Sequence, residues 1–187
     1  GDSMALNFDL ASFLKFFIID MSVEIGPDGS LPDTVPFARY GGRPGDVSWT
    51  AALATVVNAV FETTGDVSVI HQALPDMLKQ LDNVKGQAAN GLAKMHTPYG
   101  DWCPPPAKLG GGQGSKPTPP YTSAFAFLDM VQKMQVMASK AGNSSVATRL
   151  TTLATKLASE FNDAFFHSSN SSYDNGIQTA NVLALKL

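Results

Sequence analysis

Apolar residues recur at the spacing of an α-helix along most of the 187 residues, and this periodicity constrains the fold more than any other feature. The segments with this spacing cover residues 9–25, 49–64, 67–84, 122–140, 144–166 and 178–187. No segment shows the apolar and polar alternation that predicts a half-buried strand. We therefore expect an all-α fold of about six helices.

Capping and helix-breaking residues predict where these helices begin and end. Asp46 or Ser48 can cap the second helix, because Asp and Ser side chains accept hydrogen bonds from free backbone N–H groups. Gly65 is placed to end the same helix in the left-handed conformation. Pro75 lies inside the third helix and is expected to kink or split it, because proline lacks an N–H donor.

Long and short connections alternate between the predicted helices. Residues 26–48 and 86–121 form long connections rich in proline and glycine, whereas Gly65-Asp66 and Gly142 mark short turns. This alternation is typical of antiparallel helix pairs whose functional loops gather at one end. Long ordered loops are uncommon unless they are functional, because they lose backbone entropy without forming a regular hydrogen-bond ladder.

Both tryptophans, Trp49 and Trp102, fall at this long-loop end, which makes them candidate stacking platforms for a sugar or another ligand. The alternative is that each indole only packs into the core. Asp33, Asp46 and Asp101 are the loop carboxylates best placed for binding or catalysis. Turn formation and helix capping are the alternative roles, since aspartate favours both.

Composition and charge exclude several classes of function. The net charge is −3 with scattered basic residues, so we expect no nucleic-acid partner. No apolar run is long enough to span a membrane. The single cysteine, Cys103, excludes an intrachain disulfide, and the three histidines lack metal-ligand spacing, so we expect neither a metal nor another cofactor. Sequons at Asn143 and Asn170 favour an extracellular or lumenal location.

Several short motifs, taken in order, resemble the catalytic domain of bacterial and fungal α-L-rhamnosidases, glycoside hydrolase family 78. They are Gly1-Asp2-Ser3 with Asn7-Phe8-Asp9, Asp28-Gly29-Ser30-Leu31-Pro32-Asp33 with Val35-Pro36, Asp46-Val47-Ser48-Trp49 ahead of Thr64-Gly65-Asp66, and Tyr99-Gly100-Asp101-Trp102. The resemblance covers nearly the whole chain. It implies an (α/α)6 barrel and hydrolysis of terminal α-L-rhamnosides with inversion, in which one carboxylic acid protonates the leaving oxygen and a second carboxylate activates water.

The resemblance also implies roles for individual residues. Trp49 and Trp102 match the tryptophans that wall the rhamnose pocket, and Asp2 matches an aspartate that binds sugar hydroxyls. Asp46 matches a recurrent loop acid, and Asp101 precedes the second tryptophan. We expect these five residues to bind a rhamnose-containing carbohydrate.

The chain departs from the family pattern in its catalytic residues. The general acid and the general base of the family are glutamates that match no position in residues 1–187, and Thr50-Ala51 follows Trp49 where the family often has Gly-Asp. We therefore expect one helical domain, residues 1–187, that is the middle portion of a larger barrel and is inactive alone. An incomplete ring would expose apolar edges through which copies could associate.

Two other functions are compatible with the sequence. The same helices could form a non-catalytic carbohydrate-binding or interaction module. Alternatively, the chain could be a different helical-barrel glycosidase or lyase that uses Asp33, Asp46 and Asp101 as its own acids.

Overall fold

The computed structural model describes residues 7–38, 41–95, 99–100 and 116–187. These residues are mostly helical, which confirms the all-α prediction. The helices are α2 (Ala11–Glu24), α3 (Val47–Thr50), α4 (Ala52–Thr64), α5 (Ser68–Gln87), the 3₁₀ helix η1 (Leu92–Lys94), α6 (Pro119–Lys140), α7 (Ser144–Phe165) and α8 (Gln178–Lys186). None of the helices in the described residues has the length and hydrophobicity that crossing a bilayer demands.

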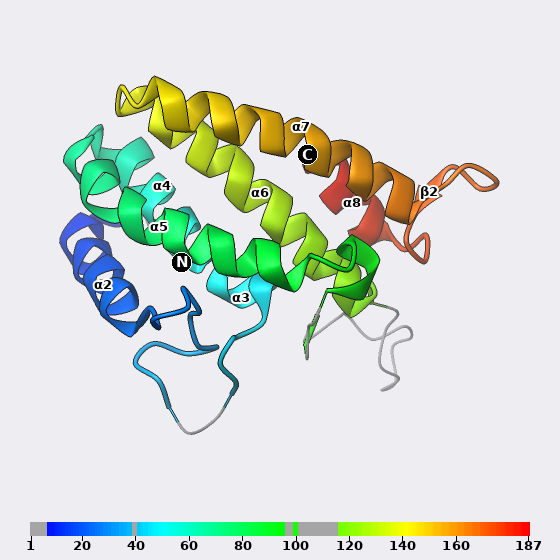
Figure 1. The fold of residues 1–187 in the computed structure, drawn as a ribbon, viewed down its shortest axis with the longest axis horizontal. Coiled ribbons are helices and arrows are strands. Elements are labelled where there is room, and N and C mark those ends of the chain that lie inside the picture. Colours follow the sequence, from blue (N-terminus) through cyan, green and yellow to red (C-terminus); the bar gives the residue numbers. More distant parts are fainter. Residues whose placement is uncertain (1–6, 39–40, 96–98, 101–115) are drawn as a thin grey trace.

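Helix α6 lies at the centre of the molecule and packs against α3, α4, α5, α7 and α8 (Figure 1). Short turns join α4 to α5 and α6 to α7, so each pair runs antiparallel. These turns lie at the left of Figure 1, whereas the described parts of the long connections lie along its lower side. The predicted separation of short turns from long loops is therefore present.

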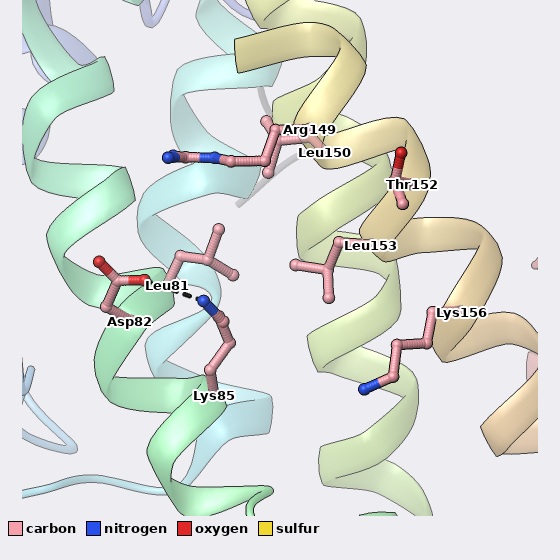
Figure 2. A pocket seen from close by; sticks show the side chains of 8 residues that line it. All are labelled: Leu81, Asp82, Lys85, Arg149, Leu150, Thr152, Leu153 and Lys156. Carbon is pink, nitrogen blue, oxygen red and sulfur yellow. Dashed lines mark hydrogen bonds and ion pairs between the residues drawn. The ribbon is translucent and has the colours of Figure 1, made fainter. Parts of the chain in front are cut away.

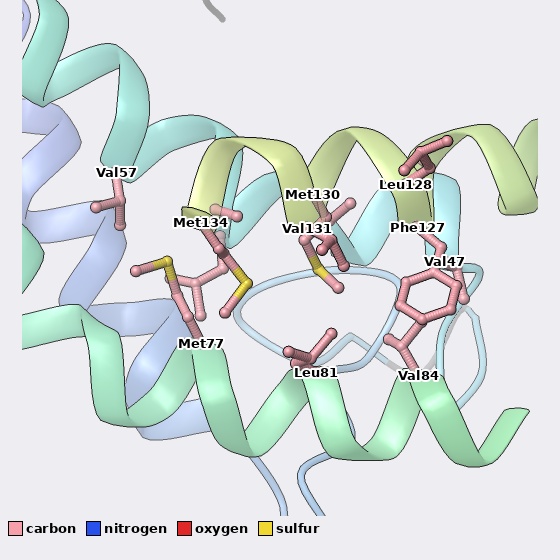
Figure 3. Packing of buried hydrophobic residues seen from close by; sticks show 14 of the residues in the cluster. Val47, Val57, Met77, Leu81, Val84, Phe127, Leu128, Met130, Val131 and Met134 are labelled. Carbon is pink, nitrogen blue, oxygen red and sulfur yellow. The ribbon is translucent and has the colours of Figure 1, made fainter. Parts of the chain in front are cut away.

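The core is built where α6 faces α4 and α5. From α6, Phe127, Met130, Val131 and Met134 are buried on the side that faces Met77, Leu81 and Val84 of α5, near Val57 of α4 (Figure 3). Methionine is unbranched and polarizable, so it fills the irregular spaces between helices that cross at an angle. Removal of this apolar surface from water is the main force that holds the helices together.

Several predicted helix ends are present, although the predicted second helix, residues 49–64, is divided at Ala51 into α3 and α4. Asp46 caps α3, because its side chain accepts a hydrogen bond from the Ser48 N–H. Gly65 ends α4 in the left-handed conformation at φ 69°. Asn143 was not predicted as a cap, but it caps α7 through a hydrogen bond from the Val146 N–H. Local capping chemistry is therefore enough to place these ends.

Pro75 was expected to kink or split the third helix, and the split is wrong, because α5 continues unbroken from Ser68 to Gln87. The kink stays a prediction. Pro75 lies on the exposed side of the helix, while Leu74 and Met77 beside it are buried. Burial of the inner face stabilises the helix enough to outweigh the one backbone hydrogen bond that proline removes.

The structure also contains short elements that were not predicted. The second long connection begins only after α5 ends at Gln87, and it includes η1. After α7, the strands β1 (Phe166–His167) and β2 (Ser172–Tyr173) pair antiparallel. Strands this short contain too few residues for an alternating pattern to be visible in the sequence.

Helix α2 buries less of its predicted apolar stripe than expected. Leu14 and Ile18 are buried, but Phe13 and Phe16 are 65% and 70% exposed. Ile19 is also exposed. Helix α2 packs against α4 and α5, and these contacts leave Phe13 and Phe16 largely exposed.

An ion pair fastens α2 to the turn between α4 and α5. Lys15 Nζ lies 2.6 Å from Asp66 Oδ2. Asp66 Oδ1 also accepts a hydrogen bond from the Ser68 N–H at the start of α5. These bonds, with Lys15 as the largest contributor, lower the pKa of Asp66 from 3.8 to about 2.

Replacement of Lys15 by Met should raise the pKa of Asp66 from about 2 towards 3.8. The pKa is lower in the folded state than in the unfolded state, so the interaction stabilises the fold above pH 3.8 and is lost as the pH falls through about 2. Carboxyl ¹³C NMR titration measures this value directly. Lys94→Met, on η1 at the far end of α5, is the control; an Asp66 pKa that is the same in all three proteins would contradict the assignment.

Candidate functional site

The first long connection folds back on itself and is anchored by Arg43. The Arg43 guanidinium donates to the carbonyl oxygens of Glu24 and Ser30 at 2.7 and 2.9 Å, and it pairs with the Glu24 carboxylate at 3.0 Å. The Gly45 N–H donates to the Leu31 carbonyl oxygen at 2.8 Å. The connection is thus bonded to the end of α2 at Glu24, and its two arms are joined to each other at Leu31 and Gly45.

The same connection packs closely on α5 at Gly29. A Cβ atom added to Gly29 would lie 2.2 Å from the carbonyl oxygen of Lys79, and the φ of Gly29 is +82°. Only glycine fits such an approach without displacement of the backbone. Nearby, Asn83 Nδ2 donates to the Asp28 carbonyl oxygen at 3.2 Å, which adds a second link between the connection and α5.

Asp46 is completely buried where the first connection enters α3. Its carboxylate accepts hydrogen bonds from the Ser48 N–H at 2.9 Å and the Ser48 hydroxyl at 2.6 Å. It also accepts from the Ser123 hydroxyl on α6 at 3.3 Å and from the Tyr99 N–H at 3.1 Å. One carboxylate therefore joins α3, α6 and the second long connection.

Asp33, in the first long connection, also joins separate segments through its carboxylate. Its Oδ1 accepts from the Asp46 N–H at 2.7 Å. Its Oδ2 accepts from the Gly42 N–H and from the Tyr99 hydroxyl, the latter at 3.1 Å. The hydrogen bond to Asp33 is the main cause of the raised pKa of Tyr99, with burial and the charge of Asp46 as further causes.

Trp49 lies at the surface beside these carboxylates. Its side chain is 38% exposed, and its ring stacks on the ring of Tyr99 with centroids 4.8 Å apart and an interplanar angle of 29°. The backbone N–H of Trp49 donates to the Asp46 carbonyl oxygen at 3.0 Å. A half-open indole on a rigid hydrogen-bonded frame is suited to stack against a sugar ring.

A pocket of about 380 Å³ adjoins this end of the molecule, between the α3–α4 segment and α6. It is lined by Ser48, Ala51, Ala52, Thr55, Gly100, Thr122, Phe125, Ala126, Asp129 and Leu183. Burial would raise the pKa of Asp129, but hydrogen bonds from Lys133 and Lys186 lower it overall. The pocket therefore offers an apolar floor, several hydroxyls and one ionised carboxylate.

A second pocket, of about 370 Å³, lies away from the long connections, between α5 and α7 (Figure 2). Leu81, Leu150 and Leu153 form its apolar floor. Lys85 and Asp82 at its edge pair with each other at 3.3 Å. The pocket of about 380 Å³ is instead lined by Ser48, which precedes Trp49 in the sequence and donates its hydroxyl to Asp46, so the Trp49 end is the better candidate site.

The structure describes part of the predicted site. Trp49 and Asp46 lie next to each other at the start of α3, whereas Asp2, Asp101 and Trp102 lie outside the described residues. Sequence reasoning did not predict Ser123, because a serine within an apolar helix carries no distinguishing pattern. Among the described residues, no group of three or more His, Cys, Asp or Glu side chains could hold a metal ion.

Comparisons with known proteins agree on one family. The family profile of the bacterial α-L-rhamnosidase six-hairpin glycosidase domain matches residues 1–187. An α-L-rhamnosidase from Dictyoglumus thermophilum is similar in structure with a TM-score of 0.76 and 26% identity, over 86% of this chain and 18% of that one. No curated protein matches the chain significantly.

A second solved structure shows the same fold. The α-L-rhamnosidase from Streptomyces avermitilis, solved in complex with L-rhamnose, is similar with a TM-score of 0.82 and 24% identity. The match covers 95% of this chain and 16% of that one. The chain thus spans less than a fifth of either protein. The helices are part of an (α/α)6 barrel of the six-hairpin type, as the sequence predicted.

Asp46→Ala should lower the free energy of unfolding by about 3 kcal/mol, because buried donors on Ser48, Ser123 and Tyr99 lose their acceptor and each unsatisfied group costs about 1 to 3 kcal/mol. Urea unfolding followed by circular dichroism measures the change. Asp82→Ala is the control, since this side chain is 75% exposed and its ion pair should contribute less than about 0.5 kcal/mol. Equal stability of the two variants would show that Asp46 does not hold the site together.

Proposed function

Because the chain belongs to the bacterial α-L-rhamnosidase six-hairpin glycosidase domain family, we propose that it forms part of a pocket for terminal α-L-rhamnose. The exposed indole of Trp49 is the observation that supports this proposal most directly. Its apolar face would pack on the C–H face of the sugar ring. The L-rhamnose complex of the Streptomyces protein, which shares the fold, is consistent with this ligand.

We propose that the remaining predicted residues share this pocket. Trp102 would provide the second aromatic wall, while Asp2 and Asp101 would accept hydrogen bonds from sugar hydroxyls. Asp46 would act by a different route, because its carboxylate is buried and already accepts four hydrogen bonds from described residues. It would contribute to binding by fixing Trp49 and Tyr99 in place.

We further propose that residues 1–187 do not hydrolyse rhamnosides alone and are part of a larger barrel. Inverting hydrolysis needs two carboxyl groups about 6.5 to 9.5 Å apart with room for a water molecule between them. Asp33 and Asp46 do not meet this need, since backbone and side-chain donors occupy their oxygens. The same observation disfavours a different glycosidase that uses these two aspartates.

Replacement of Trp49 by Ala should weaken binding of L-rhamnose at least about fivefold, because an aromatic stacking contact contributes about 1 kcal/mol. Ligand titration followed by NMR measures the dissociation constant. Phe166→Ala is a matched control, since Phe166 is an aromatic of similar exposure, 40%, that lies on β1. Loss of binding in both variants, or in neither, would contradict the proposed role of Trp49.

The purified wild-type chain should release no more product from an aryl α-L-rhamnoside than an enzyme-free blank does. Binding without turnover would support the proposal that the chain contributes to the substrate pocket but not to the chemistry. Turnover by the purified chain would overturn that part of the proposal and leave the binding measurement unaffected.

We also propose that copies of the chain associate through exposed apolar edges. On α2, Phe13, Phe16 and Val23 are 65%, 70% and 80% exposed, and on α8 Leu185 is 87% exposed. These helices lie at opposite sides of the molecule (Figure 1). Apolar surface of this kind on a folded chain favours association.

Sedimentation velocity should show that the sedimentation coefficient of the chain increases with concentration. A Phe13→Ser, Phe16→Ser double variant should shift the equilibrium to the monomer, because α2 would lose its apolar edge. Val136→Ser on α6 is the control, since Val136 is 45% exposed but lies on another helix. A wild-type chain that stays monomeric at the highest concentration would refute the proposal.

A further inference from the structure

Tyr99, in the second long connection, makes two hydrogen bonds to the first, one from its backbone and one from its side-chain hydroxyl. Its backbone N–H donates to Asp46 Oδ2 at 3.1 Å, and its hydroxyl donates to Asp33 Oδ2 at 3.1 Å. The two acceptors belong to the same connection but are separate carboxylates. The position of the Tyr99 ring is therefore fixed at the backbone and at the tip of the side chain.

The acceptor at the tip is itself held firmly. Asp33 Oδ1 accepts from the Asp46 N–H at 2.7 Å, and Asp33 Oδ2 also accepts from the Gly42 N–H. The hydrogen bond to Asp33 raises the pKa of Tyr99 above its ordinary value of 10.0, since the protonated phenol is the form that donates to the carboxylate. Hydrogen bonds to a charged acceptor are stronger than those between neutral groups.

The ring that is fixed in this way supports Trp49. The two rings stack with centroids 4.8 Å apart. Helix α3 sets the backbone of Trp49 but leaves the χ angles of the side chain to be decided by contacts. An exposed indole that samples several rotamers must be ordered on binding, which lowers affinity. Contact with an immobile tyrosine removes much of that freedom beforehand.

We infer that Asp33 and Tyr99 are positioning residues that hold the Trp49 indole in its sugar-stacking orientation, an inference that rests on the proposed rhamnose-binding function. Tyr99 acts through its ring, and Asp33 acts through the Tyr99 hydroxyl. The carboxylate of Asp33 is thus a determinant of ligand affinity without being a catalytic residue.

Tyr99→Phe tests the inference, because it removes the hydroxyl and keeps the ring. The dissociation constant for L-rhamnose should rise about fivefold, which corresponds to the loss of about 1 kcal/mol. The indole N–H signal of Trp49 in a ¹⁵N–¹H NMR spectrum, assigned with Trp49→Phe, should shift or broaden. Asp33→Asn should change both measurements in the same direction, because it weakens the acceptor and leaves the Tyr99 ring intact.

Tyr173→Phe is the matched control. Tyr173 also donates its hydroxyl to a side-chain oxygen, that of Asn162, but it lies on β2. Tyr173→Phe should lower the free energy of unfolding about as much as Tyr99→Phe does. It should leave both the L-rhamnose affinity and the Trp49 indole signal unchanged. An equal loss of affinity in Tyr173→Phe would show a general stability effect and overturn the inference.

The outcomes separate this inference from the proposed function. If the wild-type chain does not bind L-rhamnose, the proposed function fails, while the Trp49 indole signal in Tyr99→Phe still shows whether the ring is held. If the wild-type chain binds and Tyr99→Phe matches it in affinity and in the indole signal, the inference is wrong and the proposed function stands.

Discussion

The buried carboxylate of Asp46 is the interaction on which the loop end of this molecule depends. It caps α3, reaches Ser123 on α6 and receives the backbone N–H of Tyr99. A buried carboxylate is costly unless several donors surround it, and here backbone and hydroxyl donors supply that compensation. The result is a fixed junction of segments that are far apart in the sequence, with Trp49 at its surface.

Helix α6 is the central contact of the helices, as Asp46 is of the loops. It contacts α3, α4, α5, α7 and α8, and nearly all of its long apolar side chains are buried. The outer edges of the array are different, because Phe13 and Phe16 of α2 and Leu185 of α8 remain largely exposed. This contrast is what a portion of an (α/α)6 barrel should show, since each helix of a ring is covered by its neighbours.

The charged side chains of the first long connection support the loops, whereas the side chain proposed to bind the ligand is exposed. Asp33, Asp46 and Arg43 use their charged groups on internal hydrogen bonds that shape the first long connection. Trp49 is the described member of the predicted site that remains accessible, at 38% exposure. The proposed binding role of Trp49 depends on rigidity, because a ligand gains most from an aromatic side chain that is already in its bound orientation.

The sequence by itself determined the helices and most of their ends, because apolar periodicity, Gly65 and the cap at Asp46 act over a few neighbouring residues. It also placed Trp49 at the long-loop end. Only the tertiary structure decided that Pro75 is tolerated inside α5, that Phe13 and Phe16 stay exposed, and that Asp33 and Ser123 join the Asp46 junction. These outcomes depend on which segments meet in space, and partners such as Asp46 and Ser123, which are 77 positions apart, leave no local pattern for the sequence to show.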